Sequence, residues 1–261
     1  RICRGKTNKF DVSELNVEGN IISGWNDCVN TLMDRFFPSD VDFVCPRLDD
    51  SLVSDVLSED EVIDAFLRIK SKKSPGLDGF IGEMVKSLFS AVPQFVFVLL
   101  SKCVSEGYFP DCWKMARVVV LLKSPMKDKS SPGSYRGISL LPVLGKVLER
   151  IMVNRIGVTN NPAQYGFREN KGIYDAWTYV IDVVRNSSSK YILGIFIDFR
   201  GAFDNLKWGY ILHYLNSIHC KNVRLWKSYF SHRRGVVFGA NDSVSKEMSR
   251  GCPQGSICGP Y

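Results

Sequence analysis

The chain has 261 residues, of which 45% are apolar and 23% charged, and its formal net charge is +7. This composition excludes a disordered or collagen-like chain and suffices for one large domain or two smaller ones. No apolar run reaches the roughly 18 residues of a spanning helix, and the first residues lack the apolar stretch of a signal peptide, so we expect an intracellular protein without a membrane partner. Because the sequence begins without Met and stops within a pattern, we expect it to be part of a longer protein.

The distribution of charged and metal-binding side chains narrows the range of partners. Residues 1–67 carry 6 basic and 14 acidic side chains, residues 68–155 carry 15 and 6, and residues 156–261 carry 13 and 7. An acidic leader thus precedes a basic body, which favours a polyanion partner, although a solvated basic surface would give the same totals. Eight cysteines without a Cys-x-x-Cys pair, and three histidines without ligand spacing, favour reduced, mostly buried thiols over a zinc site.

The first half of the chain is mainly helical by its pattern. Amphipathic spacing predicts a helix over residues 22–37, which Pro38 ends, and then an acidic loop over residues 38–57. A second helix begins at Ser58-Glu59-Asp60-Glu61, a capping-box pattern, and ends in the stretch 70–79, whose Pro and glycines cannot continue it. The next predicted elements are an apolar helix over Gln94–Ser105, a β-branched strand over Arg117–Lys123 and a loop over Pro125–Gly133.

The second half mixes helices with strands. Helical spacing recurs in four segments, residues 144–152, 173–185, 208–215 and 223–230. Tyr191–Asp198 is an apolar run that we expect to form a buried strand ending on a carboxylate. Val236–Gly239 and Ser243–Ser249 predict a hairpin that leads into Gly251–Ser256. The mixture predicts an α+β fold.

Asp198 is the first candidate for chemistry. A carboxylate at the end of a buried strand has lost hydration, which is costly unless a cation or hydrogen-bond donors compensate. Asp198 could simply cap the next turn, but Phe203 follows after a sharp bend. A carboxylate that binds Mg²⁺ beside an aromatic ring suits a nucleotide site, with the metal on phosphate oxygens and the ring limiting what fits over the sugar. We expect Asp204 to cap a helix from residue 205 onward rather than contact the metal.

Two motifs in the second half carry a family resemblance. Asp198 to Asp204 resembles the first catalytic motif of reverse transcriptases, and Pro253-Gln254-Gly255-Ser256 resembles the loop motif that follows it in the palm. Four upstream segments resemble finger motifs of non-LTR, LINE-type retrotransposon enzymes: Ser74–Gly79, Trp113-Lys114 with Lys123, Ser134–Leu141 and Gln164–Arg168. The resemblance covers residues 58–261, and residues 22–42 look most like arthropod type-1 elements that insert into ribosomal RNA genes.

The resemblance implies a right-hand polymerase fold with fingers, a partial palm and no thumb. Its divisions would be an acidic upstream linker over residues 1–57, fingers over 58–165 and the first part of the palm over 166–261. It further implies Mg²⁺ as cofactor, with Mn²⁺ as the alternative ion. The implied partners are an RNA template, a DNA primer or target end and deoxynucleoside triphosphates. The implied place of action is the nucleus, and related elements carry an endonuclease in the same polyprotein.

The resemblance also assigns roles to individual residues. Asp198 is the expected catalytic metal ligand, and the expected nucleotide contacts are Lys123, Arg136, Phe203, Gln254 and Gly255. The expected template contacts are Lys72, Lys73, Gly76, Asp78 and Gln164. Lys and Arg suit phosphate, and Gly255 lets the backbone approach a base closely. Tyr165 and Phe167 could stack on a template base or could be buried. Without the resemblance, each of these motifs reads as surface charge, a helix stop, a linker or a turn.

Departures from the family pattern limit the prediction. The family usually has Pro after the finger Arg, whereas this chain has Gly137, so we expect a less rigid loop there. Two-metal chemistry needs more than one carboxylate, and the family supplies the rest in an aromatic-x-Asp-Asp turn that this sequence does not reach. We therefore expect polymerase activity of the intact protein and not of this chain alone. The alternative is a noncatalytic nucleic-acid-binding remnant. An RNA-templated RNA polymerase is disfavoured because Phe203 would crowd a ribose 2′-OH.

Overall fold

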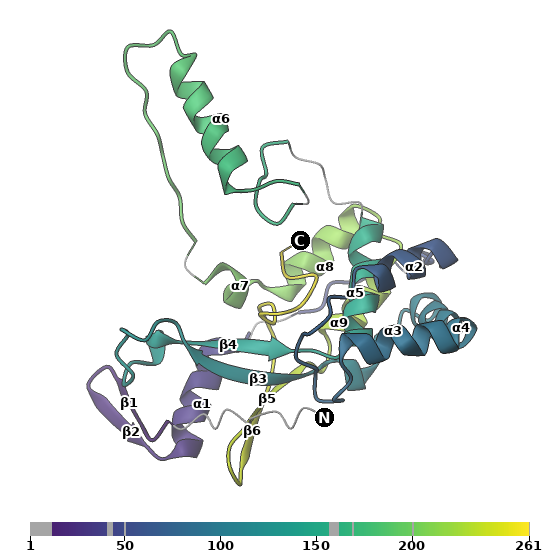
Figure 1. The fold of residues 1–261 in the computed structure, drawn as a ribbon, viewed down its shortest axis with the longest axis horizontal. Coiled ribbons are helices and arrows are strands. Elements are labelled where there is room, and N and C mark those ends of the chain that lie inside the picture. Colours follow the sequence, from purple (N-terminus) through teal and green to yellow (C-terminus); the bar gives the residue numbers. More distant parts are fainter. Residues whose placement is uncertain are drawn as a thin grey trace.

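A four-stranded sheet forms the centre of the computed structural model, which describes residues 12–40, 44–49, 51–156, 162–168, 170–199 and 201–260. The strand order is β4-β3-β5-β6. Strand β3 (Met115–Leu122) pairs antiparallel with β4 (Tyr135–Leu140) and parallel with β5 (Arg234–Phe238), which pairs antiparallel with β6 (Ser243–Glu247). Helices surround this sheet, and one helix projects away from it (Figure 1). The segments predicted as fingers and palm thus share a sheet, while the predicted domain boundaries stay predictions.

The predicted α+β class is confirmed, and most predicted helices are present with ends shifted by a few residues. Elements that the sequence pattern did not predict are also present, namely the strands β1, β2 and β4, the helices α3 and α7 and the short 3₁₀ helices η1 and η2. The remaining elements are β1 (Glu14–Val17), β2 (Asn20–Ser23), α1 (Trp25–Phe36), α2 (Glu59–Leu67), α3 (Gly82–Ala91), α4 (Pro93–Ser105), η1 (Asp111–Trp113), η2 (Pro132–Ser134), α5 (Val143–Ile156), α6 (Ile173–Arg185), α7 (Ala202–Asn205), α8 (Trp208–Ser217) and α9 (Val223–Phe230).

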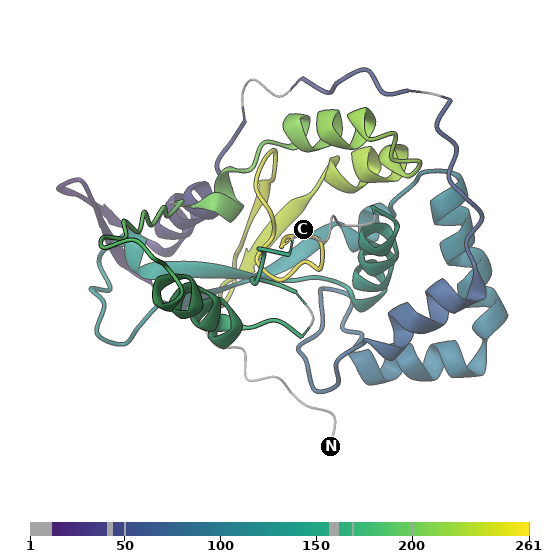
Figure 2. The same ribbon diagram turned by 90° about the horizontal axis from the view of Figure 1, so that it is seen from above.

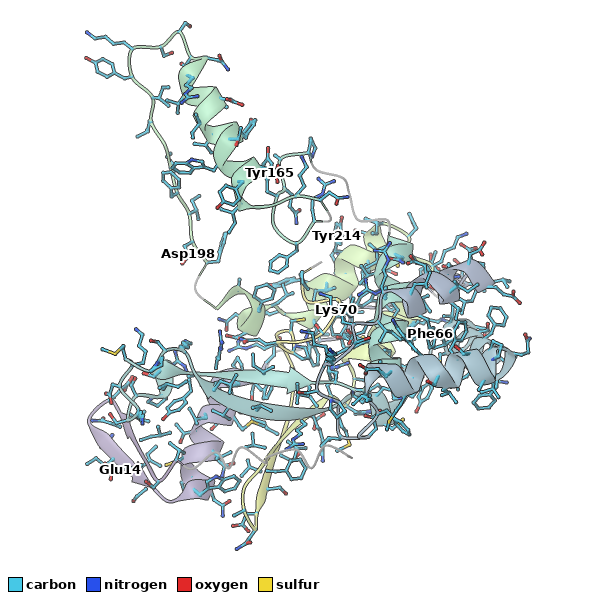
Figure 3. The ribbon with its side chains drawn as sticks, in the orientation of Figure 1. Glu14, Phe66, Lys70, Tyr165, Asp198 and Tyr214 are labelled. Atoms are coloured by element: carbon cyan, nitrogen blue, oxygen red, sulfur yellow. The ribbon has the colours of Figure 1, made fainter. Side chains whose placement is uncertain are left out.

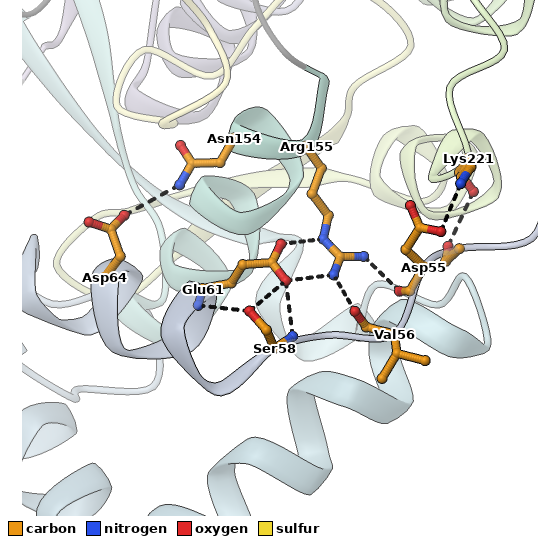
Figure 4. Close-up of polar contacts among 9 residues, drawn as sticks. Asp55, Val56, Ser58, Glu61, Asp64, Asn154, Arg155 and Lys221 are labelled. Carbon is orange, nitrogen blue, oxygen red and sulfur yellow. Dashed lines mark hydrogen bonds and ion pairs between the residues drawn. The ribbon is translucent and has the colours of Figure 1, made fainter.

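An ion-pair network fixes α2 to α5 at one end of the sheet. The capping box is confirmed, because the Ser58 hydroxyl accepts from the Glu61 N–H at 3.3 Å and the Ser58 N–H donates to the Glu61 carboxylate at 3.0 Å. The same carboxylate accepts two bonds from the Arg155 guanidinium, at 2.6 and 2.8 Å (Figure 4). These bonds lower the pKa of Glu61 to about 2. Arg155 also donates to the carbonyls of Asp55 and Val56, so the segment that leads into α2 is held against α5.

Helix α1 lies at the other end of the sheet and explains the departure at Gly137. Gly137 lies within β4, paired with Val120, and not in a loop. A Cβ at Gly137 would lie 2.7 Å from a ring carbon of Phe36 in α1, so a larger residue would push the helix off the strand. The expectation of a less rigid loop is therefore wrong. Glycine at this position lets the acidic N-terminal region pack directly on the sheet.

The central core is aromatic and lies between α8 and α9, which run beside the sheet (Figure 2). The Tyr229 ring packs edge-on against Phe109 and Trp226, with centroids 5.1 and 5.6 Å apart, and Trp208 stacks on Phe230 at 5.2 Å. Such rings bury large apolar areas and dominate the stability of a core. The seven described cysteines are all unpaired, and four of them are buried: Cys28, Cys103, Cys220 and Cys258. Cys3 lies outside the described residues.

The segment from residue 162 to 199 forms an arm that carries α6 and extends from the body (Figure 1). The predicted strand Tyr191–Asp198 is wrong, because these residues form no ladder with any described strand. Their side chains are exposed, Ile195 and Ile197 each by 77%. An apolar run can become a strand only where another strand accepts its backbone hydrogen bonds, and no described strand lies beside this run.

Two apolar helices of the body, α3 and α4, are relevant to whether a helix of this chain could cross a membrane. Among the described residues, no single helix is long and apolar enough to cross a bilayer. The consecutive helices α3 and α4 pass that test only when taken together, and they are bent by 107° at the break between them.

Candidate nucleotide site

The hairpin of β3 and β4 presents two of the predicted phosphate ligands on one face. Arg136 lies opposite Leu121 in the ladder, and the Lys123 N–H continues the pairing by donating to the Ser134 carbonyl at 2.8 Å. Residues 121 and 123 point to the same face of a strand, so Lys123 and Arg136 are diagonal neighbours within reach of long side chains. Both are exposed, and the Lys123 ammonium donates to the Gly133 carbonyl at 3.0 Å. Arg136 was expected in a loop, but it lies within β4.

A third cation, Arg35, reaches the same hairpin from α1. Its guanidinium lies 3.6 Å from the position that a Cβ on Gly133 would take, next to the carbonyl that Lys123 contacts. Arg35 and Lys123 both act electrostatically on Asp204. The sequence analysis did not select Arg35, because an exposed Arg in the last turn of an amphipathic helix has an ordinary surface role in most proteins. Only the packing of α1 on β4 brings it to this site.

The turn after Asp198 packs against the Pro-Gln-Gly-Ser loop, so the two motifs of the resemblance meet. The Cys252 N–H donates to the Phe203 carbonyl at 2.7 Å, and the Gly251 N–H donates to the Leu206 carbonyl at 2.8 Å. The Gln254 amide donates to the Asp204 carboxylate at 3.4 Å. Burial raises the pKa of Asp204, while the Gln254 bond and the charges of Lys123 and Arg35 lower it.

Asp204 differs from its predicted role as a helix cap. It lies inside α7, which Gly201 precedes, and the following helix α8 begins only at Trp208 after Lys207. The capping prediction is therefore wrong. The short α7 turns the Asp204 carboxylate toward Gln254 instead, so that it becomes part of the contact between the two motifs.

The Pro-Gln-Gly-Ser loop is also held by β4 and by a buried carboxylate of α5. The Ser139 N–H donates to the Gln254 carbonyl at 2.8 Å, and a Cβ on Gly255 (φ +132°) would lie 2.3 Å from the Ser139 carbonyl oxygen. Below the loop, the buried Glu149 carboxylate accepts the Ile257 N–H at 2.5 Å. Burial raises the pKa of Glu149 and the positive charge of buried Arg233 opposes that effect. The close approach at Gly255 can be made only by glycine.

Asp198 itself is exposed at the base of the arm, just before α7 (Figure 3). No hydrogen bond or ion pair joins it to another described residue, and Arg200 between it and α7 lies outside the described residues. Phe203 is 40% exposed and its ring meets Phe167 edge-on, with centroids 6.0 Å apart. The structure thus brings Phe203, Gln254 and Gly255 together but does not bury Asp198 among them. Among the described residues no group of three or more His, Cys, Asp or Glu side chains could hold a metal ion.

The predicted template residues lie in two separate places. Lys72, Lys73, Gly76 and Asp78 belong to the loop after α2, where the Lys72 N–H donates to Glu83 at 2.7 Å and a Cβ on Gly76 would lie 2.5 Å from the Pro142 nitrogen. Burial raises the pKa of Asp78, whose carboxylate accepts the Phe80 N–H. Gln164 lies at the base of the arm and donates to the Gly166 carbonyl of its own turn. The structure brings the loop residues together and leaves Gln164 apart.

The two aromatic residues near Gln164 also belong to the arm. Tyr165 packs against Tyr179 of α6 with centroids 6.1 Å apart, and Lys171 lies 5.2 Å above its ring. Phe167 is 63% exposed. The alternative that Phe167 is buried is therefore wrong. Stacking of Tyr165 or Phe167 on a template base stays a prediction.

Comparison with known proteins places the chain in a family. Residues 126–261 match the family described as reverse transcriptase (RNA-dependent DNA polymerase). Over its whole length the chain is 44% identical to a 115 kDa protein in the type-1 retrotransposable element R1DM of Drosophila melanogaster and 42% identical to the retrovirus-related Pol polyprotein of the type-1 element R1 of Bradysia coprophila.

A more distant relative is the RNA-directed DNA polymerase from mobile element jockey of Drosophila melanogaster, 27% identical over 88% of the chain. The chain spans about a quarter of the length of these relatives, 26% to 27%. The profile match and the full-length identities agree with the motifs that meet in the structure. The chain therefore belongs to the reverse transcriptase family, and its relatives are proteins of non-LTR retrotransposons.

Proposed function

We propose that the protein containing this chain is an RNA-directed DNA polymerase that copies retrotransposon RNA into DNA for target-primed integration. The observation that carries the proposal is the packing of the turn after Asp198 on the Gly251–Ser256 loop, beside the cations of the β3–β4 hairpin. Its proposed substrates are deoxynucleoside triphosphates, an RNA template and a DNA primer or target end. Its proposed place of action is the nucleus.

The cations of the hairpin are suited to the leaving group of nucleotidyl transfer. The reaction displaces pyrophosphate in line, so negative charge spreads over the triphosphate and must be met by cations that are already in place. Lys123 and Arg136 share one face of the hairpin, and Arg35 adds a third positive charge from α1. We assign the first two to the triphosphate, with Arg136 able to make two parallel bonds to one phosphate.

The turn and loop are suited to the base and sugar of the nucleotide. Gln254 and Gly255 lie at the exposed surface of the loop, where the amide can donate and accept and the backbone can approach closely. We assign Phe203, partly exposed beside them, to the sugar side, where its ring would exclude a ribose 2′-OH. The loop residues Lys72, Lys73, Gly76 and Asp78, together with Gln164, are proposed to contact the template.

A divalent ion is the proposed cofactor, Mg²⁺ first and Mn²⁺ as the alternative. Mg²⁺ is usually held by one or two carboxylates together with substrate phosphates. The exposed carboxylate of Asp198 has no described protein partner and can serve as one such ligand. When bound, the ion would neutralise phosphate charge. The chain's own residues hold the triphosphate, the sugar and the template around that position.

Asp198→Asn in the full-length protein tests the proposal. The amide keeps the size of the side chain but binds a divalent ion poorly, so primer extension should fall by at least about a hundredfold while RNA binding stays within about twofold. Asp182→Asn removes the same charge from the exposed face of α6 and should leave both readouts unchanged. Extension that persists within about tenfold of wild type would show that Asp198 is not the metal ligand. A wild-type protein that binds RNA but never extends a primer would instead favour the noncatalytic remnant.

A further inference from the structure

The contact between the two motifs includes a pair of side chains, Asp204 and Gln254, that lie 50 residues apart in the sequence. The Gln254 amide nitrogen Nε2 lies 3.4 Å from the Asp204 carboxylate oxygen Oδ1. Asp204 is partly buried at this contact, whereas Gln254 is exposed on the loop. A side chain assigned to the nucleotide therefore has a carboxylate behind it, and that carboxylate has no part in the nucleotide contacts proposed above.

Backbone hydrogen bonds fix the main chain of both residues. The Asp204 N–H donates to the Gly201 carbonyl at 3.1 Å, which closes the short turn of α7. The second carboxylate oxygen, Oδ2, lies 3.9 Å from the position that a Cβ on Gly201 would take, so the carboxylate folds over this turn. The Gln254 carbonyl accepts the Ser139 N–H at 2.8 Å. With both main chains held, the freedom that remains to Gln254 is the rotation of its side chain.

The charges around Asp204 favour its ionised form. Burial raises the pKa of Asp204, while the Gln254 bond and the positive charges of Lys123 and Arg35 lower it. Neither cation forms an ion pair with Asp204 in the part of the chain that the structure describes, so both act from a distance and leave the carboxylate oxygens to Gln254. An ionised carboxylate accepts hydrogen bonds and donates none.

The carboxylate determines which way the glutamine amide is turned. A glutamine side chain carries a donor, the NH2 group, and an acceptor, the carbonyl oxygen Oε1. Only the NH2 group can bond to an ionised carboxylate, since two acceptors placed together make no hydrogen bond and repel each other. Asp204 therefore draws the NH2 group inward, and the carbonyl oxygen of the planar amide is turned away from Asp204. At the exposed surface of the loop, that oxygen is a fixed hydrogen-bond acceptor.

We propose that Asp204 is a positioning residue that holds the Gln254 amide in one orientation, so that Gln254 meets the nucleotide as a hydrogen-bond acceptor. The group that Gln254 recognises is a hydrogen-bond donor of the nucleotide, a sugar hydroxyl or a base N–H. This inference rests on the proposed polymerase function and deepens it, because it concerns the same nucleotide site. Holding a flexible side chain in its bound orientation avoids the cost of ordering it on binding, which is about two- to tenfold in affinity.

Substitutions of Asp204 in the full-length protein test the inference through nucleotide binding. The Kd for dTTP is measured on a template with a dideoxy-terminated primer, so that binding is observed without extension. Asp204→Leu removes the acceptor and should raise this Kd about fivefold, because the amide must then be ordered on binding. Asp204→Asn keeps one acceptor oxygen and should raise the Kd only about twofold. In extension assays the KM should follow the Kd, and kcat should stay within about twofold, since Asp204 does not touch the reacting atoms.

A dideoxynucleotide distinguishes the two sources of the donor. The same Kd is measured for 2′,3′-dideoxy-TTP, which lacks the sugar hydroxyl. An increase with Asp204→Leu for dTTP alone supports the inference with the sugar hydroxyl as the donor. An equal increase for both nucleotides supports it with a base N–H as the donor.

Gln254→Met separates positioning from a direct role of Asp204. If Asp204 acts through the Gln254 amide, then Asp204→Leu should raise the Kd for dTTP by less than about 1.5-fold once that amide is absent. An equal increase with and without Gln254 would overturn the inference, because Asp204 would then act on the nucleotide or on the fold directly. A folded Asp204→Leu protein with the wild-type Kd, or with a lowered kcat and an unchanged Kd, would overturn it as well.

Asp242→Asn provides the matched control, because it removes a carboxylate from the exposed turn between β5 and β6. It should leave the Kd for dTTP unchanged. Failure of this inference is distinguishable from failure of the proposed function. A wild-type protein that binds RNA but neither binds nor incorporates deoxynucleotides would refute the polymerase proposal and this inference with it. Independent effects of Asp204 and Gln254 in a protein that extends primers would refute only the positioning role.

Discussion

The strand β3 and the arm segment 191–197 have the same kind of sequence and opposite surroundings. Both are short, apolar and rich in β-branched residues, yet Val118 and Val120 of β3 are buried whereas Ile195 and Ile197 of the arm are exposed. The difference is in the neighbours. Strand β3 has β4 on one edge and β5 on the other, whereas the arm segment has no described strand beside it. An apolar pattern states what a segment can become, and the available partner decides what it becomes.

The same contrast applies to helices. Helix α9 is amphipathic and its apolar face is buried against α8 and Phe109, while α6 is equally amphipathic and exposes Tyr174, Trp177 and Val183. The body therefore gains its stability from tertiary packing, and the arm depends on local structure. Three pairs of matched residues, one from the body and one from the arm, test this difference.

The largest difference is expected between two tryptophans. Trp208 is 3% exposed, stacks on Phe230 and donates to the Gly251 carbonyl at 2.7 Å, whereas Trp177 of α6 is 63% exposed. Trp208→Ala should lower the free energy of unfolding by about 3 to 5 kcal/mol, and Trp177→Ala by less than about 0.5 kcal/mol. Urea unfolding of the 261-residue chain, followed by circular dichroism, measures both. Equal losses would show that α6 packs on the body.

Two glycines should give the next largest difference. Gly255 has φ +132° and its added Cβ would meet the Ser139 carbonyl at 2.3 Å, whereas nothing lies within 4 Å of a Cβ at Gly166 in the arm. Gly255→Ala should cost about 1 to 3 kcal/mol of unfolding free energy, and Gly166→Ala less than about 0.5 kcal/mol. The same urea unfolding experiment measures the free energy of unfolding of both variants. If Gly255→Ala unfolds like wild type, then the loop does not press on β4.

The smallest difference concerns acids at helix starts and their response to pH. The pKa of Glu61 is lowered to about 2 from 4.5, so its contribution to stability is fully present above about pH 4.5 and is lost as the pH falls toward 2. After a discount for partial exposure, that contribution is about 1 to 2 kcal/mol. Glu61→Gln should remove most of it and flatten the acid limb of stability between pH 4.5 and 2.

Asp175 provides the comparison for this measurement in the arm. Among the described residues, its carboxylate accepts one hydrogen bond, from the Gly172 N–H at 2.6 Å. No guanidinium from another described element reaches it, in contrast to Glu61, which binds Arg155. Asp175→Asn should therefore change the free energy of unfolding by less than about 0.5 kcal/mol at pH 7. Acid titrations of the two variants against wild type separate the cases. A Glu61→Gln protein with an unchanged acid limb would show that the bond to Arg155 contributes little.

Several elements of the fold around the site were predictable because local patterns specify them. The capping box at Ser58, the strand that ends near Lys123 and the helix at residue 208 follow from short-range rules, and the structure contains all three. Asp204 and Arg35 were not predictable in the same way. Asp204 was expected to cap a helix, and its contact with Gln254 spans 50 residues of sequence. Arg35 comes from α1 and reaches the hairpin only because Phe36 fits over Gly137.

The motifs, their order and the basic character of the chain after residue 67 follow directly from residue type and spacing. Those properties also led to the family that the comparisons show. Which segments found partners depended instead on the packing of the whole chain. It joined the turn at residues 201–206 to the loop at 251–256, brought Arg35 beside the β3–β4 hairpin and left Tyr191–Asp198 without a described partner strand. Backbone hydrogen bonds and close packing between distant segments depend on where other parts of the chain lie, and no local pattern contains that information.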